Sequence, residues 1–316
     1  MIEEDGKSMN IRNIIKRVIY FSRDSIDGIS GLRFLRKNKG KDEKLLVLTD
    51  LIGDSVYGLS YVEEIKKKYS DKRIVVIGNE KYSKLIRSYN GIDRFVLLPG
   101  RQGRYLKIGA FLRCTWLSYI ALKEDIINTD PYLYKDLRKK TNNDAFYLLK
   151  TQIFHIPEDS KISYHGIGSN TAQTVHDKKV AVINPYSISV KIIDFAIFEL
   201  IAKVLRENNY KVYTNVVGNQ EVIAGTEKLE CDIYKLFDIA SNSSLIVSAR
   251  SGILDFLAPS GINMFIIYAN TTREFYEMYH IDKWRCGGKY KEYFVENKID
   301  KDDIMSEFIK FMKTNQ

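Results

Sequence analysis

Three polar segments of this sequence each follow an apolar run of the kind that forms a buried strand. The carboxyl ends of parallel strands face the ligand site in an open α/β sheet, so we expect these segments to lie at one cleft. One segment carries carboxylates, one carries hydroxyl groups with a lysine, and one carries an arginine, a Ser-Gly pair and a carboxylate. They are residues 50–56, 184–191 and 250–255.

The first segment, within the stretch LTDLIGDSV (residues 48–56), allows two interpretations. Spacing alone favours a turn at Gly53 in which Asp54 caps the following helix. The functional alternative is a carboxylate base that takes the proton of an attacking hydroxyl group. Asp50 is a weaker competitor for the same role.

Basic residues are concentrated near the N-terminus. The net charge is +9, and from Lys7 to Lys41 there are ten Lys or Arg residues against two Asp. Five apolar residues of this region share one helical face, so a basic amphipathic helix could rest on an anionic membrane. The alternative that we favour is a terminal helix packed on the protein, with a solvated basic face. The five residues are Ile11, Ile14, Ile15, Val18 and Ile19.

Composition excludes several classes of protein. No apolar run reaches the length of about 18 residues expected of a membrane-spanning helix, and the polar start MIEEDGKSMN is unlike a secretion signal. The three cysteines fit neither a disulfide framework nor a metal site, and the four histidines lack metal-ligand spacing. No nucleic-acid motif is present. We therefore expect a cytoplasmic protein, at most peripheral at the inner face of a membrane.

Strand and helix patterns alternate in two blocks, which predicts a parallel α/β fold. The first block has expected strands at 45–49, 73–78 and 94–98, and the stretch 104–150 is expected to be helical without a strand. The second block has expected strands at 179–185, 211–217, 244–249 and 262–268. We expect two Rossmann-like domains facing a cleft. The expected divisions are a helical extension 1–40, domains 41–165 and 178–300, and a C-terminal helix 301–316.

The three segments together resemble glycosyltransferase family 9, the heptosyltransferases, over roughly residues 45–100 and 179–270. The family signature is a strand, then a short loop that ends in Leu-Gly-Asp, then a helix, and Ile52-Gly53-Asp54 matches the tripeptide here. The resemblance implies the GT-B fold and a sugar transfer from a nucleotide-sugar donor with inversion and without a metal or other cofactor. It implies a cell-surface or lipid-linked glycan as acceptor, and it makes Asp54 the catalytic base.

The family's second domain opens with Asn-Pro, a loop of small residues and a lysine. Here Asn184-Pro185, Ser187, Ser189 and Lys191 match. The resemblance implies that the lysine and the loop hydroxyls bind the donor's phosphates, which suits their charge and hydrogen-bonding capacity. The alternative without a binding role is an ordinary surface lysine beside a polar loop. The aromatic residue and the proline that follow the family lysine are absent.

The third segment keeps the family's Ser251-Gly252 but has Arg250 in place of an aspartate and Asp255 in place of a histidine. Arg250 could bind phosphate oxygens with its forked guanidinium, and Asp255 could hold it or bind a donor hydroxyl. The alternative is a buried ion pair between the two that only ties strand to helix. Gly218 and Glu221, after another expected strand, are weaker donor-binding candidates.

Two other classes of function remain open. One is an epimerase or hydrolase that acts on nucleotide sugars with the same fold, for which the cleft would need further acid and base groups. The other is a non-catalytic nucleotide-sugar-binding protein, which the two departures from the family pattern keep open. Fold type does not choose among these classes.

Overall fold

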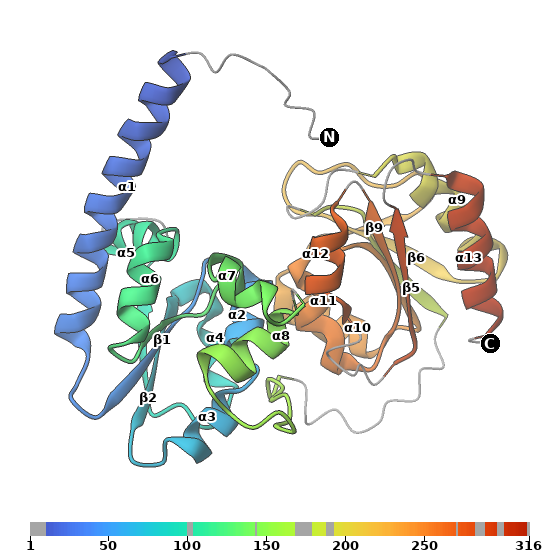
Figure 1. Cartoon of the computed structure of the whole chain (residues 1–316). Coiled ribbons are helices and arrows are strands. Elements are labelled where there is room, and N and C mark those ends of the chain that lie inside the picture. Colours follow the sequence, from blue (N-terminus) through green and yellow to red (C-terminus); the bar gives the residue numbers. More distant parts are fainter. Residues whose placement is uncertain are drawn as a thin grey trace.

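The computed structural model contains two parallel β-sheets, each covered by helices (Figure 1). It describes residues 11–99, 104–142, 144–167, 179–187, 193–269, 271–281, 288–295 and 300–314. The fold class expected from the sequence, two Rossmann-like units with a helical N-terminal extension, is confirmed.

The first sheet has four strands in the order β3-β2-β1-β4. Its central strands β1 and β2 are almost entirely buried, which accounts for their apolar sequences. Their bounds are Glu43–Val47 for β1, Arg73–Asn79 for β2, Arg94–Leu98 for β3 and Ile126–Asn128 for β4.

The second sheet has six strands in the order β10-β9-β8-β5-β6-β7. The order places β5 beside β8, so the loops after these two strands lie next to each other. The bounds are Val180–Asn184 for β5, Lys211–Asn215 for β6, Glu227–Leu229 for β7, Leu245–Ala249 for β8, Asn263–Ala269 for β9 and Tyr290–Val295 for β10.

Most helices cover the faces of the two sheets, and α1 runs along α5 and α6 at one side of the molecule (Figure 1). In the first half the helices are α1 (Ile11–Asn38), α2 (Ile52–Leu59), α3 (Val62–Lys68), α4 (Ser83–Arg87), α5 (Arg104–Leu112), α6 (Thr115–Leu122), α7 (Lys135–Lys139) and α8 (Ala145–Tyr147), followed by a π-helix at Leu148–Ile153. In the second half they are α9 (Phe195–Glu207), α10 (Ile233–Ser241), α11 (Gly252–Leu257), α12 (Arg273–Met278) and α13 (Lys301–Lys313). Short 3₁₀ turns occupy Glu80–Tyr82, Pro131–Leu133 and Ala258–Ser260.

Three strands were not predicted. The expectation of a strand-free stretch at 104–150 is wrong, because β4 lies there and pairs in parallel with β1. With three residues, β4 is too short to show a pattern of its own. β7 also has three residues, and β10 carries polar residues that hide its strand character.

The two halves share one hydrophobic core. A single cluster of buried side chains includes Tyr57 and Phe146 from the first half and Phe256 and Tyr279 from the second. Two first-turn glycines, Gly53 of α2 and Gly252 of α11, allow these helices to touch. A Cβ built on Gly53 would lie 2.7 Å from the Cα of Gly252 and 2.8 Å from a carboxylate oxygen of Asp255.

We expect the substitution Gly53→Ala to destabilise the protein by roughly 1–3 kcal/mol, because its methyl group would overpack this helix contact. Gly109→Ala on α5 is the matched control, since its Cβ would meet only Arg113, at an ordinary 3.5 Å. Alanine should raise the stability of this helix by up to about 1 kcal/mol. Urea unfolding of both variants measures the difference, and equal effects would contradict the close contact.

Candidate functional site

Asp54 is the third residue of α2, directly above the end of β1. Leu51 occupies the N-cap position of this helix, and no side chain caps it. The interpretation of Asp54 as a helix cap is therefore wrong. Its carboxylate instead accepts a hydrogen bond of 3.2 Å from the Thr49 hydroxyl group. Asp54 stays partly exposed, within the junction of the two halves.

A second carboxylate, Asp130, lies beside Asp54. It follows β4, and α2 packs on the residue before it, since a Cβ on Gly58 would lie 2.5 Å from the Thr129 hydroxyl oxygen. Asp54 and Gly58 are four residues apart and so share a face of α2. Burial and then the charge of Asp130 raise the pKa of Asp54 to about 7. Burial also raises the pKa of Asp130, to about 6.

Asp130 is a residue that the sequence reasoning missed. Its strand went unrecognised, so the sequence Thr-Asp-Pro that follows β4 was not placed at a strand end. The available signal was an Asp-Pro pair shortly after the two isoleucines of β4. In the structure Asp130 also accepts a hydrogen bond of 2.9 Å from the backbone N–H of Tyr132, which fixes its position.

Arg250 and Asp255 form an ion pair with a shortest N–O distance of 2.7 Å, and both side chains are almost fully buried. The other guanidinium contacts go to the carbonyl groups of Ser251 (2.6 Å) and Tyr279 (3.1 Å) and to the Tyr57 hydroxyl (3.4 Å). With two bonds to Asp255, these contacts account for all five N–H groups of Arg250. The pair ties the end of β8 to α11, as the structural alternative expected, and the bond to the Tyr57 hydroxyl reaches the first half of the chain.

Tyr279 brings a hydroxyl group from the second half toward the two carboxylates. Burial raises its pKa well above the ordinary range, and the charges of Asp54 and Asp130 add to this effect. Its ring packs edge-on against Tyr57, with ring centres 5.4 Å apart. The sequence reasoning missed both tyrosines, because 21 tyrosines are spread along the chain.

The loops after β5 and β8 are joined by side-chain hydrogen bonds. The Asn184 amide donates to the hydroxyl groups of Ser248 (3.0 Å) and Ser251 (3.2 Å). Asn215, at the end of β6, donates to the amide oxygen of Asn184 at 2.9 Å. The Ser187 hydroxyl donates to the carbonyl of Arg250. The second and third polar segments thus meet, as expected, whereas Ser189 and Lys191 lie outside the described residues.

Gly252 and Asp50 have surroundings that the sequence did not indicate. The space beside Gly252 is filled by Gly53 of α2, so the start of α11 faces another helix. Asp50 accepts a hydrogen bond from the Asn79 side chain and lies 3.3 Å from the Lys81 ammonium group. Its carboxylate therefore joins the ends of β1 and β2.

Gly218 and Glu221 lie on the exposed loop after β6. Gly218 has a φ of +61°, and its N–H donates to a carboxylate oxygen of Glu230 at 3.1 Å. The Tyr186 hydroxyl donates to the carbonyl of Glu221 at 2.8 Å, which ties this loop to the one after β5. These two bonds attach the loop to other parts of the second half.

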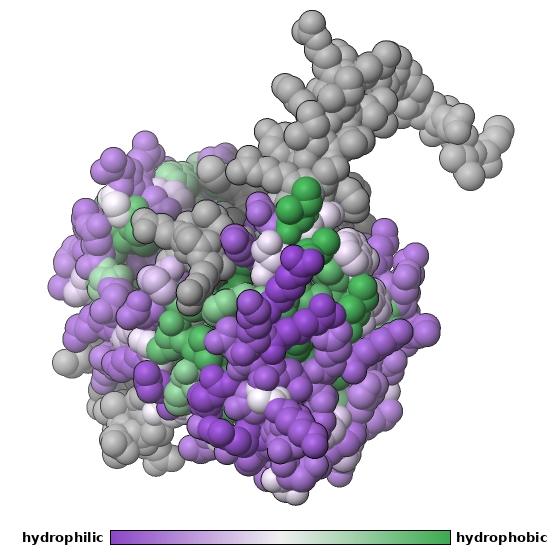
Figure 2. All heavy atoms as spheres, turned by 90° about the vertical axis from the view of Figure 1, so that its left-hand side faces the viewer, coloured by the Kyte–Doolittle hydropathy of each residue, from purple (hydrophilic) through white to green (hydrophobic). Residues whose placement is uncertain are grey.

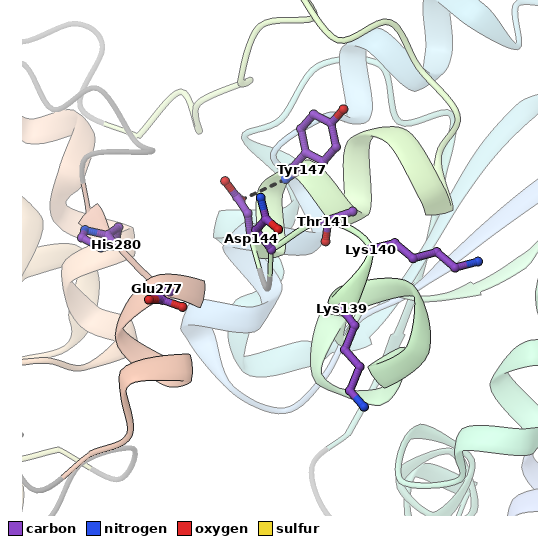
Figure 3. Close-up of a pocket in the computed structure, with 8 residues that line it drawn as sticks. Lys139, Lys140, Thr141, Asp144, Tyr147, Glu277 and His280 are labelled. Atoms are coloured by element: carbon purple, nitrogen blue, oxygen red, sulfur yellow. Dashed lines mark hydrogen bonds between the residues drawn. The ribbon is translucent and has the colours of Figure 1, made fainter.

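A cleft of about 890 Å³ opens between α7–α8 and the end of α12 (Figure 3). His280 lies on its second-half wall, and its Nδ1 is 2.9 Å from a carboxylate oxygen of the buried Glu292. Glu292 also accepts bonds from the Tyr268 hydroxyl and the Ile281 N–H. The side chains of Lys139 and Lys140 point away from His280. The lining residues are Lys139, Lys140, Thr141, Asn142, Asp144, Tyr147, Glu277 and His280.

The fold matches solved glycosyltransferase structures. Family 9 glycosyltransferase from Veillonella parvula matches with a TM-score of 0.58 and 13% identity, over 87% of this chain and 97% of that one. E. coli ADP-heptose LPS heptosyltransferase II matches with a TM-score of 0.57 and 14% identity, over 86% of this chain and 99% of that one. E. coli heptosyltransferase WaaC with ADP matches with a TM-score of 0.55 and 10% identity, over 86% of this chain and 98% of that one. This chain has the GT-B fold.

No family model matches the sequence, and no curated protein matches it. The resemblance to family 9 is confirmed at the level of the GT-B fold. In this GT-B protein, the polar segments of the two halves meet at the junction where α2 touches α11. No group of three His, Cys, Asp or Glu side chains is arranged for a metal ion within the described part of the chain.

We expect Arg250→Met to lower the free energy of unfolding by about 3–5 kcal/mol, because Asp255 would be left buried without its partner. The double variant Arg250→Met/Asp255→Leu should recover most of this loss, since it removes both charges. Guanidinium chloride unfolding of the single and double variants measures both values. A loss below about 1 kcal/mol in the single variant would contradict a structural role for the pair.

Proposed function

We propose that this protein is a glycosyltransferase that moves a sugar from a nucleotide-sugar donor to a glycan acceptor. The acceptor proposed is a cell-surface or lipid-linked glycan, and the transfer inverts the anomeric carbon without a metal ion. One observation carries the proposal: Asp54 is a partly exposed carboxylate at the end of β1, and its pKa is raised to about 7. The GT-B fold supports it.

Asp54 is proposed as the general base. The acceptor oxygen attacks the anomeric carbon, its proton passes to the Asp54 carboxylate, and the nucleoside diphosphate leaves with the electrons of the broken C–O bond. A base is most effective when its pKa lies near the working pH, which suits Asp54. Burial is the larger cause of the raised Asp54 pKa, and the charge of Asp130 adds to it.

The second half is proposed to bind the donor. Lys191, with the loop hydroxyls of Ser187 and Ser189, would neutralise the departing diphosphate. Ser251 and Gly252 are proposed to line the same site, and Arg250 with Asp255 to hold the β8–α11 loop in place rather than to bind phosphate directly. Two solved structures of WaaC contain ADP and ADP-2-deoxy-2-fluoro heptose, so ADP-heptose is the first donor to test.

A non-catalytic nucleotide-sugar-binding protein is the second candidate, and one observation favours it. Arg250 occupies the position of the family aspartate, and its five N–H groups are all directed to protein acceptors. If the transfer site is inactive, a donor will bind and raise the melting temperature without being consumed.

We expect Asp54→Asn to reduce sugar transfer by about 10²–10⁴-fold, because the amide accepts no proton. The assay measures release of the nucleoside diphosphate from a panel of nucleotide sugars, beginning with ADP-heptose, with membrane glycolipid extracts as acceptors. Asp50→Asn is the matched control, since this carboxylate faces Lys81 and Asn79. We expect the control to retain most of the activity.

Transfer at the unmutated rate by the Asp54→Asn variant would show that the base assignment is wrong. A thermal-shift measurement separates this result from failure to bind. If no nucleotide sugar raises the melting temperature of the wild-type protein, the donor site itself is contradicted.

A further inference from the structure

Tyr279 directly follows helix α12 and places its ring against the first half of the protein. The residue is only 8% exposed, and its ring centre lies 5.4 Å from that of Tyr57 in α2 and 4.8 Å from that of Phe275 in α12. On the face that bears α1, by contrast, hydrophilic side chains cover much of the described surface, with hydrophobic ones between them (Figure 2). A polar group on such a face can bond to water, whereas an enclosed one depends on a partner in the site.

The backbone of Tyr279 is fixed by the second half. Its carbonyl oxygen accepts a hydrogen bond of 3.1 Å from the Arg250 guanidinium and lies 2.8 Å from the Tyr268 hydroxyl oxygen. Two residues further on, the N–H of Ile281 donates to a carboxylate oxygen of the buried Glu292 at 2.8 Å. These backbone contacts hold the Tyr279 ring in the junction without any contribution from its own hydroxyl group.

The Tyr279 hydroxyl group is unused by the fold. The hydrogen bonds of Tyr279 to other described residues all involve its backbone, so the hydroxyl has no protein partner among them. Burial, and then the charges of Asp54 and Asp130, raise its pKa well above the ordinary range. At neutral pH the group is therefore an uncharged phenol beside the two carboxylates, which can donate one hydrogen bond and accept others.

The charges around this hydroxyl group select the kind of ligand atom that it can bind. Asp54 and Asp130 supply negative charge, and the positive charge of Arg250 is neutralised by Asp255. A diphosphate placed beside the carboxylates would be repelled. An uncharged sugar hydroxyl suits the position, because it can bond to the phenol, and the aromatic rings around Tyr279 provide the apolar wall that is common in ligand sites.

We propose that the Tyr279 hydroxyl group binds a hydroxyl group of the transferred sugar and so holds the anomeric carbon near the acceptor oxygen at Asp54. This inference rests on the proposed function, in which the second half binds the donor, and it adds a residue that selects the sugar. A site that bonds a ligand hydroxyl disfavours sugars that lack it, because the protein group is then left without a partner.

The first test compares melting temperatures without ligand. Tyr279→Phe removes a hydroxyl that has no protein partner, so the melting temperature should not fall. Tyr69→Phe is the matched control, since the Tyr69 hydroxyl donates to the carbonyl of Phe154 at 3.0 Å, near Lys44 at the start of β1 and so away from Asp54. The control should melt roughly 2–4 °C lower. An equal fall in Tyr279→Phe would show a structural role for its hydroxyl and overturn the proposal.

The second test is calorimetric titration with ADP and with ADP-heptose. We expect Tyr279→Phe to bind ADP like the wild type and ADP-heptose about 3–10-fold more weakly, which is the loss of one neutral hydrogen bond. Tyr69→Phe should bind both ligands like the wild type. If another nucleotide sugar of the panel binds instead, the same comparison uses that sugar and its free nucleotide.

The outcomes separate this inference from the proposed function. If the wild type binds a nucleotide sugar and Tyr279→Phe binds it equally well, only the role of Tyr279 is overturned. An equal loss of affinity for the nucleotide and for the nucleotide sugar would also overturn it, because the contact would then not be to the sugar. If the wild type binds no nucleotide sugar of the panel, the proposed function fails and this inference fails with it.

Discussion

The contact between α2 and α11 is the constraint on which the rest of the junction depends. Gly53 and Gly252 let the two helices approach until a Cβ on either would overlap the other's backbone. This approach carries Asp54, next to Gly53, toward Arg250 in the loop before α11 and Asp255 in α11 itself. A bulkier residue at either glycine would separate the two halves and open the space between these groups.

Charge at the junction follows from this geometry. Arg250 is neutralised by Asp255 inside the protein, so little of its positive charge reaches Asp54. Asp54 instead lies beside another carboxylate, Asp130, which with burial raises its pKa to about 7. Asp54 and Asp130 thus form a pair of carboxylates beside a neutral ion pair, a setting that favours proton acceptance near neutral pH.

Much of this arrangement could be predicted from the sequence. Long buried strands such as β1 and β2 have continuous apolar runs, so the parallel sheets and the strand-end position of Asp54 followed from pattern alone. The carboxylate beside Asp54 could not be predicted in this way. β4 has only three residues, so Asp130 had no recognisable strand before it. Whether Arg250 turns toward a ligand or toward Asp255 depends on burial by α2, a contact between segments about 200 residues apart that no local pattern encodes.

The central claim is that Asp54 acts as the base, with a pKa that burial raises and that the charge of Asp130 raises further. The pH dependence of kcat/KM for sugar transfer tests it most directly, in the wild type and in Asp130→Asn. The rate should fall about tenfold per pH unit below pH 7 in the wild type, because protonated Asp54 accepts no proton. In the variant this limb should move to lower pH, because the charge that raises the Asp54 pKa is gone. A limb that stays in place, or a rate that is level from pH 5 to 8, would contradict the account.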